Sequence, residues 1–275
     1  MPASYAHLSF GQSVLHAIPD EETKTLIQKH IELFKIGLLG PDILFFYHPL
    51  SGDPINRLGH ALHYESGASF LGRECCLRAN EEQTAYLLGF ICHYVLDSEC
   101  HTLVEYYMEK TGREHSTIET DLERVLMIRD GLDPFRYFAA SSIHVRAGIA
   151  DVIAPFYEVT PKVIKKAIIS MRHIGRLLTP SSSLKHRLLT KIGKRMGESS
   201  IVSQLTMDRI PDSIFTESNH AIAQRMERAI PVAIALVVDF LAWQRGEAPL
   251  SRRFQPNFSF DPEELARLKE RNTRV

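Results

Sequence analysis

Residues Thr84–Lys110 read TAYLLGFICHYVLDSECHTLVEYYMEK and contain no proline, which is the strongest signal of the fold in this chain. Asn80 precedes this stretch and Gln83 follows Asn80 by three residues, which is the pattern of a helix N-cap with its capping-box partner. Gly112 interrupts the pattern shortly after Lys110. The sequence therefore predicts one long, largely apolar helix that runs to Lys110.

Helical signals also dominate the rest of the chain. A helical segment opens at Pro19-Asp20 and stops at Gly40-Pro41, and another runs from Ser116 to Arg129. Further helices are expected near residues 161–178, 183–195, 213–243 and 261–271. The chain shows no convincing run of alternating strands, no hairpin dipeptide between β-rich runs and no internal repeat. We predict an all-α fold, with residues 1–275 forming a single domain.

Composition and charge argue against several classes of protein. The 275 residues include 32 Lys and Arg against 33 Asp and Glu, a net charge of −1 that argues against a generic nucleic-acid binder. The N-terminus, MPASYAHLSFGQS, has neither the basic nor the apolar region of a secretory signal. The longest apolar run, Ala229–Val238, is shorter than the ~20 residues that span a bilayer. We therefore expect a cytoplasmic protein with no nucleic-acid partner.

Residues 159–197 are basic and contain no acidic residue. The ten cations of this segment are Lys162, Lys165, Lys166, Arg172, Arg176, Lys185, Arg187, Lys191, Lys194 and Arg195. Isoleucines and leucines interleave with them, which is typical of amphipathic helices. The basic face is either solvated or paired with acids of other helices, or it is a surface for peripheral contact with an anionic membrane or phosphate.

A possible metal site lies within the long helix. His93, Asp97 and His101 follow one another at steps of four residues, so their side chains lie on one face of the helix within ~80° of one another. Zinc accepts imidazole nitrogen and carboxylate oxygen, and a metal would compensate the cost of burying three ionisable groups. The alternative is a polar patch on a half-buried helix.

Other candidate ligands are weaker when each is taken alone. His115 and Glu119 have the same spacing, but Glu119 could instead be the capping-box partner of Ser116. His7 lies near the start of an expected helix and Asp42 directly after a helix end, where a structural histidine and a turn aspartate are the common alternatives.

The order of these motifs along the chain resembles that of the zinc-dependent phospholipase C family, which includes bacterial phosphatidylcholine-cleaving enzymes and α-toxin-type phospholipases. The order is a histidine, then G-P-D, then further histidines, then H-x-x-x-D, a nearby histidine and H-x-x-x-E. The resemblance covers about residues 5–130 and leaves 131–275 as a helical extension.

The resemblance implies an all-α domain that holds two or three zinc ions between helices. The metal ligands that it implies are His7, Asp42, His63, His93, Asp97, His101, His115 and Glu119. Asp97 matches the aspartate that bridges two metals, and Asp42 matches the catalytic aspartate close to the attacking water. For the middle histidine we choose His63, because it precedes an expected helix start; His48 and His60 are the alternatives.

The function that the resemblance implies is hydrolysis of a phosphodiester in a phospholipid or similar phosphate ester by a zinc-activated water. One alternative is a related zinc nuclease or nucleotidase. Another is a non-catalytic member that keeps metal for structure and uses its basic helices to bind a partner or membrane.

Overall fold

The computed structural model describes residues 4–49, 51–197 and 200–273. Within these ranges the regular secondary structure is helical, apart from an isolated β-bridge that joins Ser66 and Asn257. The predicted all-α fold is confirmed. The α-helices are α1 (Ser4–Ala17), α2 (Glu21–Lys29), α3 (Ile31–Gly37), α4 (Pro54–Tyr64), α5 (Gly67–Leu71), α6 (Glu74–Leu77), α7 (Glu81–Thr111), α8 (His115–Arg129), α9 (Ile149–Ile153), α10 (Pro161–Leu178), α11 (Ser183–Met196), α12 (Ile201–Leu205), α13 (Thr216–Gln244) and α14 (Pro262–Thr273). The 3-10 helices are η1 (Gly40–Phe46), η2 (Ala139–Ser142), η3 (Ala154–Tyr157), η4 (Ser213–Phe215) and η5 (Arg252–Phe254).

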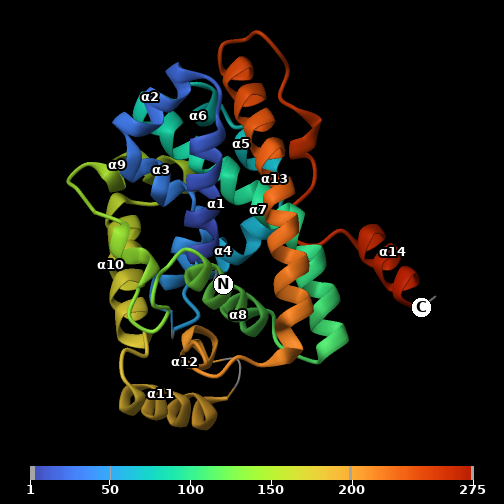
Figure 1. Cartoon of the computed structure of the whole chain (residues 1–275). Coiled ribbons are helices and arrows are strands. Elements are labelled where there is room, and N and C mark those ends of the chain that lie inside the picture. The colour runs from blue at the N-terminus through green and yellow to red at the C-terminus, as the bar shows by residue number, and fades with distance from the viewer. Residues whose placement is uncertain (1–3, 50, 198–199, 274–275) are drawn as a thin grey trace.

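Helix α7 is the centre of the molecule (Figure 1). Its N-terminus is fixed by the capping box expected from the sequence, in which Asn80 and Gln83 each accept a hydrogen bond from the other's backbone N–H. Its C-terminus ends at Gly112, which adopts φ +67°. Most of the helix from Thr84 to Val104 is buried, as expected for a helix that is apolar on all sides.

Glycines bring α3 very close to α7. A Cβ atom on Gly37 would lie 2.1 Å from the carbonyl oxygen of Tyr86, and one on Gly89 would lie 2.1 Å from that of Phe34. Because neither glycine carries a side chain, the two backbones can touch. This contact places η1, which directly follows α3, beside the middle of α7.

The segment expected to be one helix from Asp20 to Gly40 differs from the prediction. It divides at His30, whose φ of −118° and ψ of 36° are not helical, into α2 and α3. The Asp20 side chain caps α2 by accepting from Thr23 N. The division lets α3 turn onto α7 while α2 remains nearer the surface (Figure 1).

The C-terminal helices surround this centre. The four expected there correspond to α10, α11, α13 and α14, with ends that differ from the prediction by at most three residues. Helix α13 lies along α7, and α11 lies at one end of the molecule (Figure 1). One hydrophobic core joins residues from Tyr5 to Leu265. Within the described ranges, the helices are too short or too polar to cross a bilayer.

Candidate metal centre

The eight predicted metal ligands come from five elements and meet in one cluster. Helix α7 supplies three of them, α8 supplies two, and α1, η1 and α4 supply one each. The cluster consists of His7, Asp42, His63, His93, Asp97, His101, His115 and Glu119.

Asp97 lies at the centre of this metal cluster. Its Oδ1 is 3.2 Å from His7 Nε2 and 3.6 Å from His101 Nε2. Its Oδ2 is 3.1 Å from His93 Nε2 and 3.7 Å from His63 Nε2. Because the two carboxylate oxygens face different pairs of imidazoles, the carboxylate has the orientation needed to bridge two cations.

Asp42 extends the cluster on one side of Asp97. Its Oδ1 is 2.9 Å from His63 Nε2, and its Oδ2 is 3.8 Å from His93 Nδ1. Asp42 lies in the first turn of η1 and is almost fully buried. Gly40, two residues earlier, has a φ of +51°, and a Cβ there would lie 2.4 Å from the His93 ring. The glycine of G-P-D therefore lets the chain pass over His93 and turn Asp42 toward it.

Glu119 extends the cluster on the other side. Its Oε1 is 3.0 Å from His115 Nε2 and 3.7 Å from His101 Nε2. Helix α8 begins at His115 with Glu114 at the N-cap position, so Ser116 lies inside the first turn. The capping box considered for Ser116 and Glu119 is wrong for this reason, and the Glu119 carboxylate faces the histidines instead.

Backbone carbonyls orient three of the imidazoles. Each imidazole places Nδ1 at hydrogen-bond distance from a carbonyl oxygen, so that a proton on Nδ1 leaves the lone pair of Nε2 free for a metal. The pairs are His63 with Gly59 at 2.8 Å, His93 with Leu38 at 3.2 Å and His101 with Phe258 at 2.7 Å. Phe258 precedes α14 and carries no local sequence signal of this role, so its contact with His101 could not be predicted.

The buried polar atoms of the cluster fit metal ions. Both oxygens of Asp42, Nε2 of His93, Nδ1 of His7 and Oε2 of Glu119 are buried. Although other members of the cluster lie close to some of these atoms, none of the atoms makes a hydrogen bond of good geometry within the part of the chain that the structure describes. Such atoms destabilise a fold unless another group satisfies them. Three sets of ligand atoms each lie within 4.8 Å of one another and could hold an ion. The sets are His7, His93 and Asp97; Asp42, His63 and His93; and His101, His115 and Glu119.

The cluster also sets the protonation of its members. Burial alone would raise the pKa values of Asp97 and Glu119, but the surrounding imidazoles hold both well below their usual range. Burial alone would lower the pKa of His101, but the Asp97 and Glu119 carboxylates raise it to about 9. The carboxylates are therefore ionised at neutral pH, and a cation that binds here displaces protons from imidazoles.

Comparison with known proteins agrees with this geometry. The sequence profile described as zinc-dependent phospholipase C matches residues 6–168, which is more than half of the chain and includes every member of the metal cluster. The chain belongs to the zinc-dependent phospholipase C family. No curated protein and no solved structure matched the chain.

The two other candidates for the middle histidine lie apart from the ligand sets of this phospholipase C family member. His48 is 40% exposed, with Nδ1 3.3 Å from Asp53 and Nε2 against the Lys166 ammonium. His60 lines the pocket that contains His63, and its ring packs 4.2 Å from that of Phe45. His63 as the ligand stays a prediction, which its distances to Asp42 and Asp97 support.

A pocket of about 230 Å³ opens onto the phospholipase C-type cluster. Besides six cluster histidines and carboxylates, aromatic rings of Phe45, Tyr64 and Phe260 line it. Glu105 lines it as well, one turn after His101, and forms no hydrogen bond or ion pair among the described residues. Glu105 was not among the predicted site residues, although it continues the four-residue spacing of His93, Asp97 and His101.

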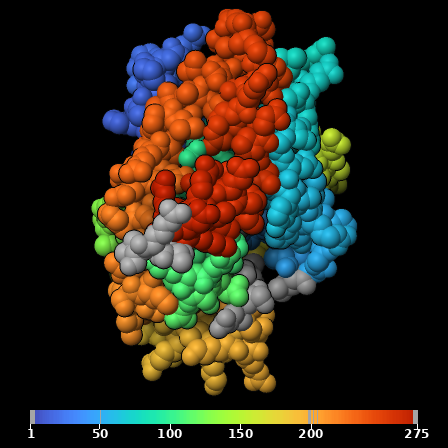
Figure 2. Space-filling view, turned by 90° about the vertical axis from the view of Figure 1, so that its right-hand side faces the viewer, coloured from blue at the N-terminus to red at the C-terminus, as the bar shows by residue number. Residues whose placement is uncertain are grey.

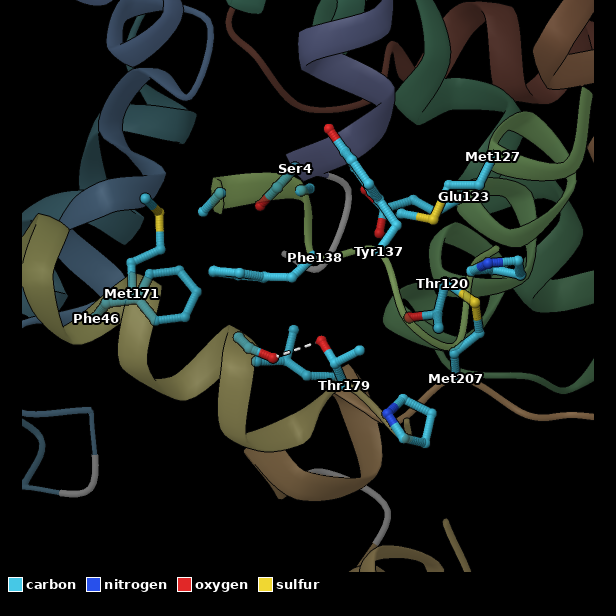
Figure 3. Close-up of a pocket in the computed structure, with 16 residues that line it drawn as sticks. Ser4, Phe46, Thr120, Glu123, Met127, Tyr137, Phe138, Met171, Thr179 and Met207 are labelled. Atoms are coloured by element: carbon cyan, nitrogen blue, oxygen red, sulfur yellow. Dashed lines mark hydrogen bonds between the residues drawn. The ribbon is translucent and has the colours of Figure 1, made fainter. Parts of the chain in front are cut away.

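Glu123 helps to hold His7 in place without joining the cluster. Its Oε1 accepts hydrogen bonds from the backbone N–H groups of Tyr5 and Ala6, in the first turn of α1. Helix N-termini leave such donors without partners inside the helix, and the Glu123 oxygen satisfies two of them. Glu123 also borders a separate cavity of about 80 Å³, opposite Phe138 and Met171 (Figure 3).

Proposed function

We propose that this protein is a metal-dependent phosphodiester hydrolase that acts on a phospholipid or a similar phosphate ester. The observation that carries the proposal is the metal cluster itself, with Asp97 at its centre and a pocket that reaches it from solvent. Family membership supports the same reaction class. Cytoplasmic residence and the absence of a nucleic-acid partner stay predictions.

The residues of the cluster have two proposed roles, metal binding and orientation of the attacking water. We propose two or three zinc ions, held by His7, Asp42, His63, His93, Asp97, His101, His115 and Glu119. Zinc supplies a Lewis acid and an acidified water when it is bound. The Asp42 carboxylate, which Gly40 and His63 hold in place, is suited to orient the attacking water and to accept its proton.

The aromatic pocket wall supports an amphiphilic substrate. Phe45, Tyr64 and Phe260 surround the approach to the cluster, and the Tyr64 side chain is 73% exposed. Apolar walls beside a polar centre suit a molecule that carries both a phosphate and hydrocarbon. A zinc nuclease or nucleotidase would instead hydrolyse nucleic acid or nucleotides in a substrate panel.

Asp97→Asn tests the proposal. We expect the zinc-reconstituted wild-type protein to hold two or three ions and to hydrolyse phospholipid phosphodiesters. The variant should lose more than one ion, because Asp97 faces ligands of two sites, and its activity should fall at least about 100-fold. Elemental analysis and assays on phospholipids, nucleic acids and nucleotides measure these effects.

The matched control is Asp239→Asn, which changes an exposed carboxylate on α13 and should keep both metal and activity. Less than one zinc per reconstituted wild-type chain would contradict the proposal. Loss of a single ion from the Asp97→Asn variant would argue against a bridging carboxylate. Full metal content without hydrolysis of any phosphodiester would indicate the non-catalytic alternative.

A further inference from the structure

Helix α11 presents a row of exposed apolar side chains. Leu184, Leu188, Ile192 and Met196 are 72%, 56%, 39% and 53% exposed. Successive members are four residues apart, so each is rotated by ~40° from the last and all lie in one stripe. Single exposed apolar residues are common on protein surfaces, but a contiguous row is typical of a binding surface.

The stripe is not needed to hold α11 on the protein, because other residues of the helix do so. Leu189 and Gly193, rotated by ~100° and ~140° from Leu188, are buried. A Cβ on Gly193 would lie 2.7 Å from Ser203 Oγ, which shows how closely α12 packs. His186 lies 3.7 Å from Asp208 on the neighbouring loop. The apolar stripe therefore points away from the core.

Cations lie within and beside the apolar stripe. Relative to Leu188, Lys185 and Lys191 are rotated by ~60° in opposite directions, and Arg195 lies within ~20°. Helix α11 contains no acidic residue. Within residues 4–49, 51–197 and 200–273, none of the ten cations of segment 159–197 forms an ion pair with a carboxylate. These contacts do not support the alternative in which acidic residues of other helices neutralise this segment.

The stripe also occupies an end of the molecule. The gold side chains of α11 form the lower end of the space-filling view (Figure 2). Leu177, at the end of α10, is 65% exposed and precedes the turn into α11. A nearby hollow of about 510 Å³ along α10 is lined by Arg136, Arg172, His173 and Arg176. Helix α11 lies outside the region that the family profile matches.

We propose that α11 docks the protein on an anionic lipid bilayer, with its apolar stripe in the interface and its lysines and arginines against the headgroups. Amphipathic helices with a basic border bind membranes in this way. A second copy of the chain is a poorer occupant, because two identical faces would bring unpaired cations together. The docking rests on the surface of α11 and does not depend on the proposed hydrolase activity.

Vesicle co-sedimentation tests the docking. The wild-type protein should bind phosphatidylcholine vesicles that contain phosphatidylglycerol, more tightly at low salt than at high salt. Leu184→Ser, Leu188→Ser and Ile192→Ser together should weaken binding at least about ten-fold, since they remove the inserted surface. Lys191→Gln with Arg195→Gln should weaken it about 25-fold at low salt, from about five-fold per cation.

Two control variants match these changes. Lys162→Gln with Lys165→Gln removes two exposed cations at the far end of α10, and Val238→Ser removes an exposed apolar residue on α13. Both should bind vesicles as the wild type does. Circular dichroism should show an unchanged fold for all variants, and activity on a water-soluble phosphodiester should not change, which separates docking from catalysis.

Three results would overturn the docking proposal. They are equal binding to neutral and anionic vesicles, no binding to anionic vesicles at low salt, and unchanged binding of the triple serine variant. Concentration-dependent dimers that the triple variant abolishes, without vesicle binding, would instead assign the stripe to a second copy of the chain.

Discussion

At the scale of single residues, the choice among three histidines is the sharpest question about the metal cluster. His63→Ala should remove about one zinc ion, because Nε2 of His63 lies 2.9 Å from Asp42 Oδ1 within a set of ligand atoms. His60→Ala and His48→Ala should keep the metal, since neither belongs to a ligand set among the described residues. Elemental analysis of the three variants decides; metal loss from His48→Ala alone would show that the assignment is wrong.

A second prediction for single residues concerns Gly40, which packs against the His93 ring. Gly40→Ala should destabilise the protein by roughly 3 kcal/mol, from the cost of a left-handed backbone and the overlap with the His93 ring. It should also lower the zinc content, because His93 and Asp42 would move apart. Urea unfolding and elemental analysis measure both effects.

Gly52→Ala is the matched control for Gly40. Gly52 has a φ of +59°, but nothing lies within 4 Å of its added Cβ. This variant should therefore lose only about 1 kcal/mol and keep its zinc. Equal losses of stability in the two variants would show that contact with His93 does not matter.

At the scale of elements, the crossing of α3 and α7 positions half of the cluster. Gly89→Ala should cost roughly 3 kcal/mol, because the new Cβ would lie 2.1 Å from a carbonyl oxygen of α3, which cannot move without separating the helices. The midpoint of urea unfolding measures the loss. Asp42 follows α3 in the chain, so zinc content should fall as well.

Gly11→Ala is a matched helical comparison for Gly89. A Cβ on Gly11 would lie 2.2 to 2.8 Å from both methyls and the Cγ of Leu38, and this side chain can change its rotamer without moving a backbone. Both substitutions favour the helix intrinsically by ~1 kcal/mol, so this contribution cancels between them. A loss of stability in Gly11→Ala as large as in Gly89→Ala would contradict the rigid crossing.

At the scale of the whole molecule, Glu123 makes stability depend on pH. Burial raises the pKa of its carboxyl from 4.5 to about 8, although backbone N–H groups of Tyr5 and Ala6 oppose this. The folded protein binds this proton more tightly than the unfolded chain does. The stabilisation is therefore complete below about pH 4.5 and is lost as the pH rises through about 8.

Glu123→Gln should remove this contribution while its side-chain oxygen still accepts the two hydrogen bonds. Between pH 5 and pH 8, the free energy of unfolding of the variant should rise relative to the wild type. Urea unfolding at fixed zinc concentration and several pH values measures the difference, with Asp239→Asn as the control. A difference that does not change with pH would contradict the raised pKa.

The fold class was predictable because helices leave local signals. The capping box of α7 uses Asn80 and Gln83, three residues apart, and its end uses Gly112. The division at His30 was not predicted, because the pattern around it is helical on both sides and the packing of α3 against α7 decides the break. The exposure of the α11 stripe is likewise a tertiary property, since periodicity alone shows an amphipathic helix but not which face is buried.

The sequence by itself determined that His93, Asp97 and His101 share one helical face, because the period of the α-helix depends only on neighbouring residues. The order of motifs supplied the other candidates through the family resemblance. Three contacts depend on tertiary packing: His63 rather than His48 approaches Asp42, Glu119 faces histidines, and the carbonyl of Phe258 orients His101. These contacts join residues far apart in the chain, and the packing of whole helices, which no local pattern encodes, brings them together.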